Sequence, residues 1–140
     1  MQISVLIFIA CGIWMIGLGL YFMFVRPPLL PEDLRYMGTS LGEIKSAIPG
    51  LERWLNRVFS VMGGFMTGAG VLTIWVAMNA SDVGEKWTWI VLTSVGLLTV
   101  GTMTLTNFLL NSDFKWLLLI PSLLWIVGLV LAIVIRTSGG

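Results

Sequence analysis

Charged residues divide the chain into four long apolar stretches, each long enough to cross a lipid bilayer. Each stretch holds at least 20 uncharged residues: 1–25, 58–81, 87–112 and 116–135. A helix of about 20 residues spans a hydrocarbon core of about 30 Å, and the bilayer offers unpaired backbone amides no partners. We therefore predict an all-α membrane protein, a single domain over 1–140. Its four transmembrane helices are expected near 3–25, 57–78, 88–110 and 115–135.

The connection between the first two predicted helices, about 26–56, differs in composition from the rest of the chain. Together with Arg57 it holds nine of the fifteen charged side chains, whereas the other two connections are short. Ser40 and Glu43 have the spacing of a capping box, which starts a helix. Apolar residues then recur at steps of three and four, as on one helical face: Leu41, Ile44, Ile48, Leu51, Leu55 and Val58. We expect an amphipathic interfacial helical segment that lies along the membrane surface and runs into the second helix.

The charged side chains of this segment are candidates for contacts with a partner or with lipid headgroups. Two interpretations stay open. The segment either covers the mouth of the bundle, with its arginines extending to the headgroups, or docks a cytoplasmic or membrane partner through its mixed charges. Its four acidic residues weaken any claim for a dedicated anionic-lipid site. The candidate contact residues are Arg26, Glu32, Asp33, Arg35, Glu43, Arg53 and Arg57.

The overall composition excludes several classes of protein. Hydrophobic residues make up 57% of the chain and charged residues 11%, against about 25% charged in an ordinary soluble domain. This excludes a soluble enzyme, a disordered chain and a basic nucleic-acid binder. The chain has no His and a single Cys, Cys11, so histidine-based catalysis, most zinc sites and a disulfide framework are excluded. No Asp, Glu, Lys, Arg or His lies within the four uncharged stretches, which argues against a proton-coupled transporter. We predict no catalytic residue, cofactor or metal.

Lysine and arginine are distributed unequally between the two ends of the predicted bundle. The first and third connections carry six of them, and the opposite side carries Lys86 and Arg136. Cytoplasmic loops of membrane proteins are enriched in Lys and Arg. We therefore expect both termini to lie outside, and the first and third connections to lie in the cytoplasm.

Small residues on the second predicted helix are candidates for helix packing. Ser60, Gly64 and Gly68 recur at four-residue steps and include a GxxxG motif, with Gly63 on a parallel row. Small side chains let helix backbones approach closely in lipid. These four residues therefore pack either within the bundle or in a homodimer.

The third predicted helix carries the most polar stripe of the four, formed by Thr99, Thr102, Thr106 and Asn107. Side chains of this kind bond to their own helix or to a neighbouring one. The alternative is that they line a polar cavity.

A pattern across the charged segment and the second helix resembles a known group of proteins. It comprises PEDLRYMG at 31–38, Pro49-x-Leu51, Trp54 and Gly63-Gly64. On these residues the chain resembles small, uncharacterised four-span bacterial inner-membrane proteins with no established activity, most densely over 31–70. The resemblance implies the four-helix fold and a bacterial inner membrane, and it implies no mechanism.

These observations favour a non-catalytic integral membrane scaffold or accessory subunit of a membrane protein assembly. The uncharged stretches lack Asp, Glu, Lys, Arg and His, while the segment between the first two helices holds most of the charged side chains. The alternative is a small homo-oligomeric transporter or a lipid/hydrophobe-binding four-helix bundle, with the polar stripe of the third helix lining its cavity. The expected partners are the lipid bilayer and either other membrane subunits or further copies of the chain, and not nucleic acid.

Overall fold

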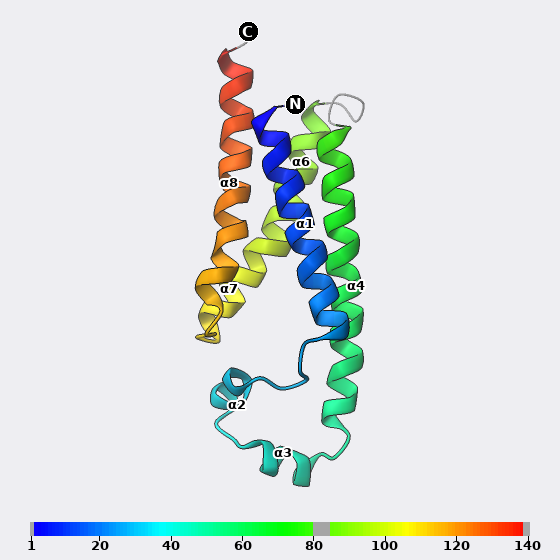
Figure 1. Ribbon diagram of the computed structural model, residues 1–140. Helices are drawn as coiled ribbons and strands as arrows, with labels where there is room; N and C mark the ends of the chain where they lie inside the picture. The colour runs from blue at the N-terminus through cyan, green and yellow to red at the C-terminus, as the bar shows by residue number, and fades with distance from the viewer. Residues whose placement is uncertain (1, 80–84, 139–140) are drawn as a thin grey trace.

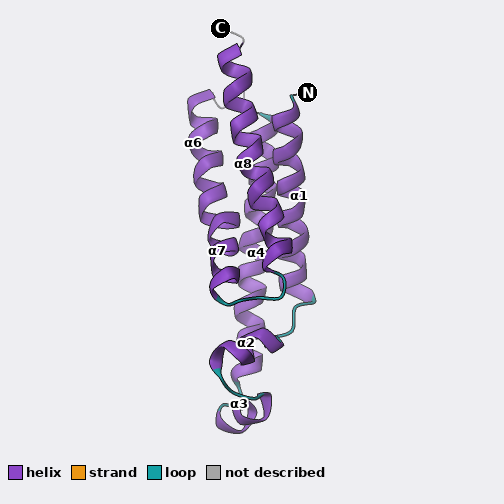
Figure 2. Ribbon diagram, turned by 90° about the vertical axis from the view of Figure 1, so that its left-hand side faces the viewer, coloured by secondary structure: helices purple, strands orange, loops and turns teal. Residues whose placement is uncertain are grey.

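Long helices form the body of the molecule, and the short helices α2 and α3 lie beyond one end of it (Figure 1). The computed structural model describes residues 2–79 and 85–138. Both termini lie at the end opposite α2 and α3, as Figures 1 and 2 show from two directions. The helices are α1 (Ile3–Phe24), α2 (Pro31–Met37), α3 (Leu41–Ala47), α4 (Leu51–Met78), α6 (Glu85–Gly96), η1 (Leu97–Gly101), α7 (Thr102–Leu109) and α8 (Lys115–Ser138).

Four candidate membrane spans run through these helices, so the chain is a multi-pass membrane protein in contact with a lipid bilayer. The mean hydropathy of their most apolar windows runs from 1.6 to 2.8. The predicted fold class is confirmed: the described residues are all α, with four apolar helices and short helices between the first two. The spans are Ile3–Phe24, Leu51–Met78, Trp87–Leu109 and Lys115–Val134.

Helix α4 begins at Leu51 rather than near residue 57. The amphipathic helix that follows Gly50 continues into the membrane span without a break, so one helix of 28 residues replaces an interfacial segment and a span. At 1.5 Å per residue it is about 42 Å long, whereas the hydrocarbon core is about 30 Å thick. Its first turns therefore project past the end of α1, where they carry α3 (Figure 1).

Helices α1 and α4 pack through glycines on both sides of their crossing. A Cβ atom added at Gly19 would lie 2.6 Å from the carbonyl oxygen of Gly63. One added at Gly70 would lie 2.6 Å from the carbonyl oxygen of Gly12. Real Cβ atoms do not approach a backbone oxygen this closely, so only glycine permits this helix separation.

The buried core lies toward the end of the bundle that holds the termini. The rings of Phe8 and Trp125 meet edge to face, with centroids 5.5 Å apart. The Trp125 indole N–H donates to the carbonyl oxygen of Leu92 at 3.0 Å, so this buried polar atom is satisfied. The core cluster comprises Phe8, Cys11, Met15, Val76, Ala77, Leu92, Val100 and Trp125.

The third span is interrupted by a π-helical turn, η1, where the sequence predicted a regular helix. Contacts from α8 accompany the wide turn. The Trp125 indole occupies the space beside Gly96, where an added Cβ would lie 2.6 Å from Trp125 Cδ1. The Ser122 hydroxyl donates to the carbonyl oxygen of Val100 at 2.9 Å. Hydrophobic periodicity does not reveal one wide turn, because the pattern on either side stays helical.

Candidate functional site

Polar contacts join the insert, residues 26–50, to the turn between α7 and α8. Glu32 of α2 is only 6% exposed. Its carboxylate accepts a hydrogen bond from the Ser112 hydroxyl at 2.7 Å and a longer one from the Asp113 backbone N–H at 3.4 Å. The Ser112 hydroxyl oxygen in turn accepts from the Phe114 N–H at 3.1 Å. This chain of bonds fastens α2 to the turn that precedes α8.

A second set of contacts joins α2 to the same turn from its exposed side. One Arg35 guanidinium nitrogen lies 3.1 Å from Asp113 Oδ1 and 3.4 Å from the Asn111 carbonyl oxygen. Lys115 donates to the Asn111 side-chain oxygen. Asn111 has a φ of 50°, the left-handed conformation that asparagine tolerates better than most residues. An exposed ion pair of this kind contributes about 0–1 kcal/mol, so the buried Glu32 contact dominates the docking of α2.

Arg26 anchors the start of the insert to the end of α1 and to the side of α4. Its side chain is 10% exposed and pairs with Asp33 at 3.3 Å. The guanidinium carbon lies 3.8 Å from the centroid of the Phe59 ring and 5.2 Å from that of Phe22. An arginine between two aromatic faces gains cation–π attraction. Arg26 is therefore occupied within the chain and is not free to extend to a partner.

Glu43 closes the capping box that the sequence predicted at the start of α3. Its carboxylate accepts from the Ser40 N–H at 2.8 Å, while the Ser40 hydroxyl accepts from the Glu43 N–H at 3.3 Å. The Ser40 N–H first, and then the Thr39 and Ser40 hydroxyls, lower the pKa of the Glu43 carboxyl. Nearby, Lys45 lies 3.5 Å from Glu52, which links α3 to the first turn of α4. Every acidic side chain of the insert and its junction with α4 therefore has a partner within the chain.

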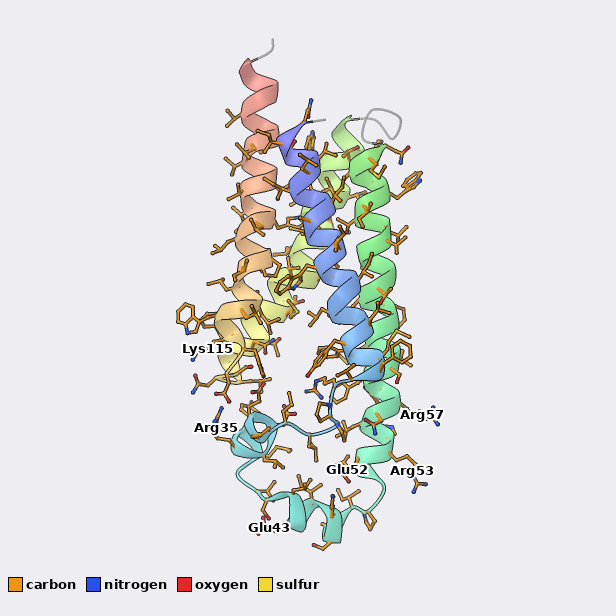
Figure 3. The ribbon with its side chains drawn as sticks, in the orientation of Figure 1. Arg35, Glu43, Glu52, Arg53, Arg57 and Lys115 are labelled. Carbon is orange, nitrogen blue, oxygen red and sulfur yellow. The ribbon has the colours of Figure 1, made fainter. Side chains whose placement is uncertain are left out.

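Arg53 and Arg57 differ from the other candidate contact residues. Both side chains are exposed, and within the described residues neither has a hydrogen bond or an ion pair. Figure 3 shows both extending from the same side of α4, away from the bundle, whereas Glu52 lies on the side of the insert. Trp54 beside them is 61% exposed. The charges that the insert and its junction leave available for an external ligand are thus cationic.

The candidate packing residues of α4 fall on two different faces. Gly63 is buried against α1, and Ser60 donates to the Met23 carbonyl oxygen of α1 at 3.4 Å. Gly64 and Gly68 are exposed, and a Cβ added at either would meet nothing within 4 Å. The GxxxG motif therefore does not mediate packing among the described residues, and the neighbouring row does.

Most side chains of the third-span polar stripe bond to their own helix or are exposed, and the polar cavity stays a prediction. The hydroxyls of Thr99 and Thr102 donate to backbone oxygens of their own helix, and so does the side-chain amide of Asn107. Thr102 and Thr106 are exposed. Where hydroxyls bond to their own helix, the lining of a polar pathway loses its donors. The interhelical contact that the sequence did not single out is Thr104 with Ser122, whose oxygens lie 2.7 Å apart.

Within the described residues, no group of three or more Cys, His, Asp or Glu side chains is close enough together to hold a metal ion. Cys11 is buried, and its thiol lies 3.8 Å from the Pro121 carbonyl oxygen, a contact between α1 and α8. An apolar hollow lies along the C-terminal half of α1 and is lined by Trp14, Gly17, Leu18 and Tyr21. The Cys11 contact contributes to helix packing and the hollow is apolar, so the candidate polar site remains the insert.

Comparison with family models, curated proteins and solved structures finds no match for the chain. The resemblance to small four-span bacterial proteins therefore stays a prediction, and what the structure supports is its coarser content, the four candidate spans.

Proposed function

We propose that this protein is a non-catalytic scaffold or accessory subunit of a larger membrane assembly. The observation that carries the proposal is the docked insert, which exposes apolar side chains outside the candidate spans. Tyr36 is 66% exposed, Met37 48% and Ile48 56%. Exposed apolar side chains on an ordered segment outside the candidate spans support a binding surface for a protein partner. The contacts of Glu32 with Ser112 and Asp113 support the proposal, because they order this surface before a partner arrives.

We further propose that the insert faces the cytoplasm of a bacterial inner membrane. The excess of Lys and Arg in the first and third connections supports this orientation. The insert would then receive a partner from the cytoplasm or from the cytoplasmic part of a neighbouring membrane subunit. Cysteine labelling with a membrane-impermeant maleimide tests the orientation, since Gly42→Cys would be labelled only after cell lysis.

The decisive experiment is extraction of the full chain from its native membrane into polymer-bounded lipid discs, followed by measurement of particle mass and composition. We expect a particle that contains other polypeptides. The double variant Met37→Ala/Ile48→Ala should lose them, whereas Ile126→Ala/Val130→Ala, which truncates two exposed side chains of α8, should keep them. Particles that contain only this chain would overturn the proposal.

The alternative function is a small homo-oligomeric transporter or hydrophobe-binding bundle. The apolar hollow lined by Trp14, Gly17, Leu18 and Tyr21 favours it. Thr99 and Thr102 do not, because their hydroxyls donate to backbone oxygens of their own helix. An apolar small molecule that co-purifies with the chain, and that Gly17→Leu displaces, would move the assignment to this alternative.

A further inference from the structure

In the insert and the start of α4, each acidic side chain has a partner within the chain. Asp33 pairs with Arg26, Glu52 pairs with Lys45, Glu32 accepts from Ser112, and Glu43 caps its own helix. The sequence alone weakened any case for an anionic-lipid site because four acidic residues share the segment with the arginines. In the folded chain those carboxylates are engaged, and Arg53 and Arg57 are left without a partner among the described residues.

These two arginines begin a continuous exposed stripe along α4. The stripe advances in steps of four, four, three, four, three and four residues, which keeps it on one side of the helix. That side is turned away from the α1 crossing. Its members, all exposed, are Arg53, Arg57, Val61, Gly64, Gly68, Val71 and Trp75.

The part of the stripe from Arg57 to Trp75 is about as long as the hydrocarbon core of a bilayer is thick. Arg57 and Trp75 are 18 residues apart, which is about 27 Å along the helix and close to the hydrocarbon thickness of about 30 Å. Arg57 then lies at the edge of the hydrocarbon core. Arg53, about 6 Å farther along the helix, lies among the headgroups. Trp54 is exposed on the same turns, at the depth where indole rings are favoured.

We propose that Arg53 and Arg57 bind the phosphate of an anionic phospholipid, with one acyl chain lying along α4 over Gly64 and Gly68. Guanidinium groups one turn apart on a helix attract the anionic phosphodiester and offer N–H donors to its two non-bridging oxygens. A zwitterionic lipid brings its own cation to the same place and is therefore held less well. The two glycines leave open space beside Phe65, which is 77% exposed. An acyl chain in that space contacts the helix backbone directly.

A second copy of this chain is the other occupant that an exposed GxxxG motif suggests. In a parallel symmetric pair that crosses at Gly64 and Gly68, the Arg57 side chains of both copies come to the same depth on adjoining faces. Like charges close together at the hydrocarbon edge oppose that arrangement. A lipid phosphate instead neutralises them, so the cationic start of the stripe favours lipid. This inference goes beyond the proposed function and does not depend on it.

Native mass spectrometry of the full-length, delipidated protein tests the site with two probes of identical acyl chains, phosphatidylglycerol and phosphatidylcholine. We expect the wild type to retain phosphatidylglycerol at least several-fold more than phosphatidylcholine. Arg53→Gln/Arg57→Gln should lower phosphatidylglycerol retention to the phosphatidylcholine level. The control Arg35→Gln/Lys115→Gln removes the same charge at the same end of the bundle and should keep the preference.

A second pair of variants tests the acyl-chain seat. Gly64→Leu/Gly68→Leu fills the space on α4 and should reduce phosphatidylglycerol retention severalfold, whereas Ala10→Leu, which enlarges an exposed side chain of α1, should not. An excess of soluble glycerol phosphate should fail to displace the lipid. The proposal is overturned if the two lipids are retained equally, if the arginine double variant behaves as wild type, or if soluble phosphate competes fully. A lipid-free dimer that Gly64→Leu/Gly68→Leu dissociates would assign the stripe to a second copy.

Discussion

Substitution of two adjacent glycines distinguishes the face of α4 that packs against α1 from the neighbouring exposed face. In Gly63→Ala the added Cβ would lie 2.6 Å from Met23 Cγ and 2.9 Å from the Met23 backbone nitrogen. The flexible methionine side chain can move aside, but the backbone of α1 cannot without separating the two helices. In Gly64→Ala the added Cβ meets nothing within 4 Å.

The expected difference in stability follows from this geometry. Both substitutions replace a helical glycine with alanine, which by itself favours the helix by about 1 kcal/mol. This gain is common to the pair and cancels in their comparison. Overpacking of a close interface costs about 1–3 kcal/mol. Because backbone atoms form the obstacle here, we expect Gly63→Ala to be less stable than Gly64→Ala by an amount toward the upper end of that range.

The assay is unfolding of the purified protein in mixed micelles by increasing fractions of SDS. The chain's seven tryptophans provide the fluorescence signal, and circular dichroism provides an independent one. Gly64→Ala should unfold at or above the wild-type midpoint, and Gly63→Ala clearly below it. Equal midpoints for the two variants, or a lower one for Gly64→Ala, would refute the assignment of the α1 crossing to the Gly63 row.

Three further predictions concern the insert and the core. Ser112→Ala removes the hydroxyl donor from the buried Glu32 carboxylate, which costs about 1–3 kcal/mol of α2 docking and should raise protease cleavage within the insert about tenfold or more. The lowered pKa of Glu43 means that its capping contribution is present above its usual pKa of 4.5 and is lost as pH falls through the lowered folded value; the protection of the α3 amides, taken relative to the intrinsic exchange rate at each pH, should therefore fall only in acid. Trp125→Phe removes the indole bond to Leu92 and should lower stability toward SDS by about 1–3 kcal/mol.

Each of these predictions has a matched comparison. Ser46→Ala removes an exposed insert hydroxyl and should leave cleavage unchanged. Equal effects of the two serine variants would therefore count against the Ser112–Glu32 hydrogen bond as the contact that docks α2. Glu43→Gln should abolish the acid-dependent loss of amide protection in α3, and persistence of that loss would assign it to another group. Trp116→Phe replaces an indole that is 65% exposed, and a loss equal to that of Trp125→Phe would contradict the buried hydrogen bond.

The fold class could be predicted because the bilayer imposes its own length and polarity on the chain. The uncharged stretches located four spans, and Ser40 with Glu43 located the start of α3, since a capping box is a local contact over three residues. The step pattern from Leu41 to Val58 also predicted that the amphipathic segment runs into the second span. Only its boundary moved, because the helix after Gly50 continues unbroken.

The tertiary structure decided which of several equivalent patterns is used. Gly63 and Gly64 stand on adjacent rows of small residues, and sequence spacing does not say which row faces α1. Glu32 finds its buried partner, Ser112, 80 residues away, and no periodicity connects the two. Ion pairs formed in the folded chain neutralise Arg26, Arg35 and Lys45, whereas Arg53 and Arg57 stay exposed. Composition and spacing thus predict which segments form membrane-spanning helices. Which face of each helix packs against a neighbour depends on the backbone and carboxylate contacts that form when the helices assemble.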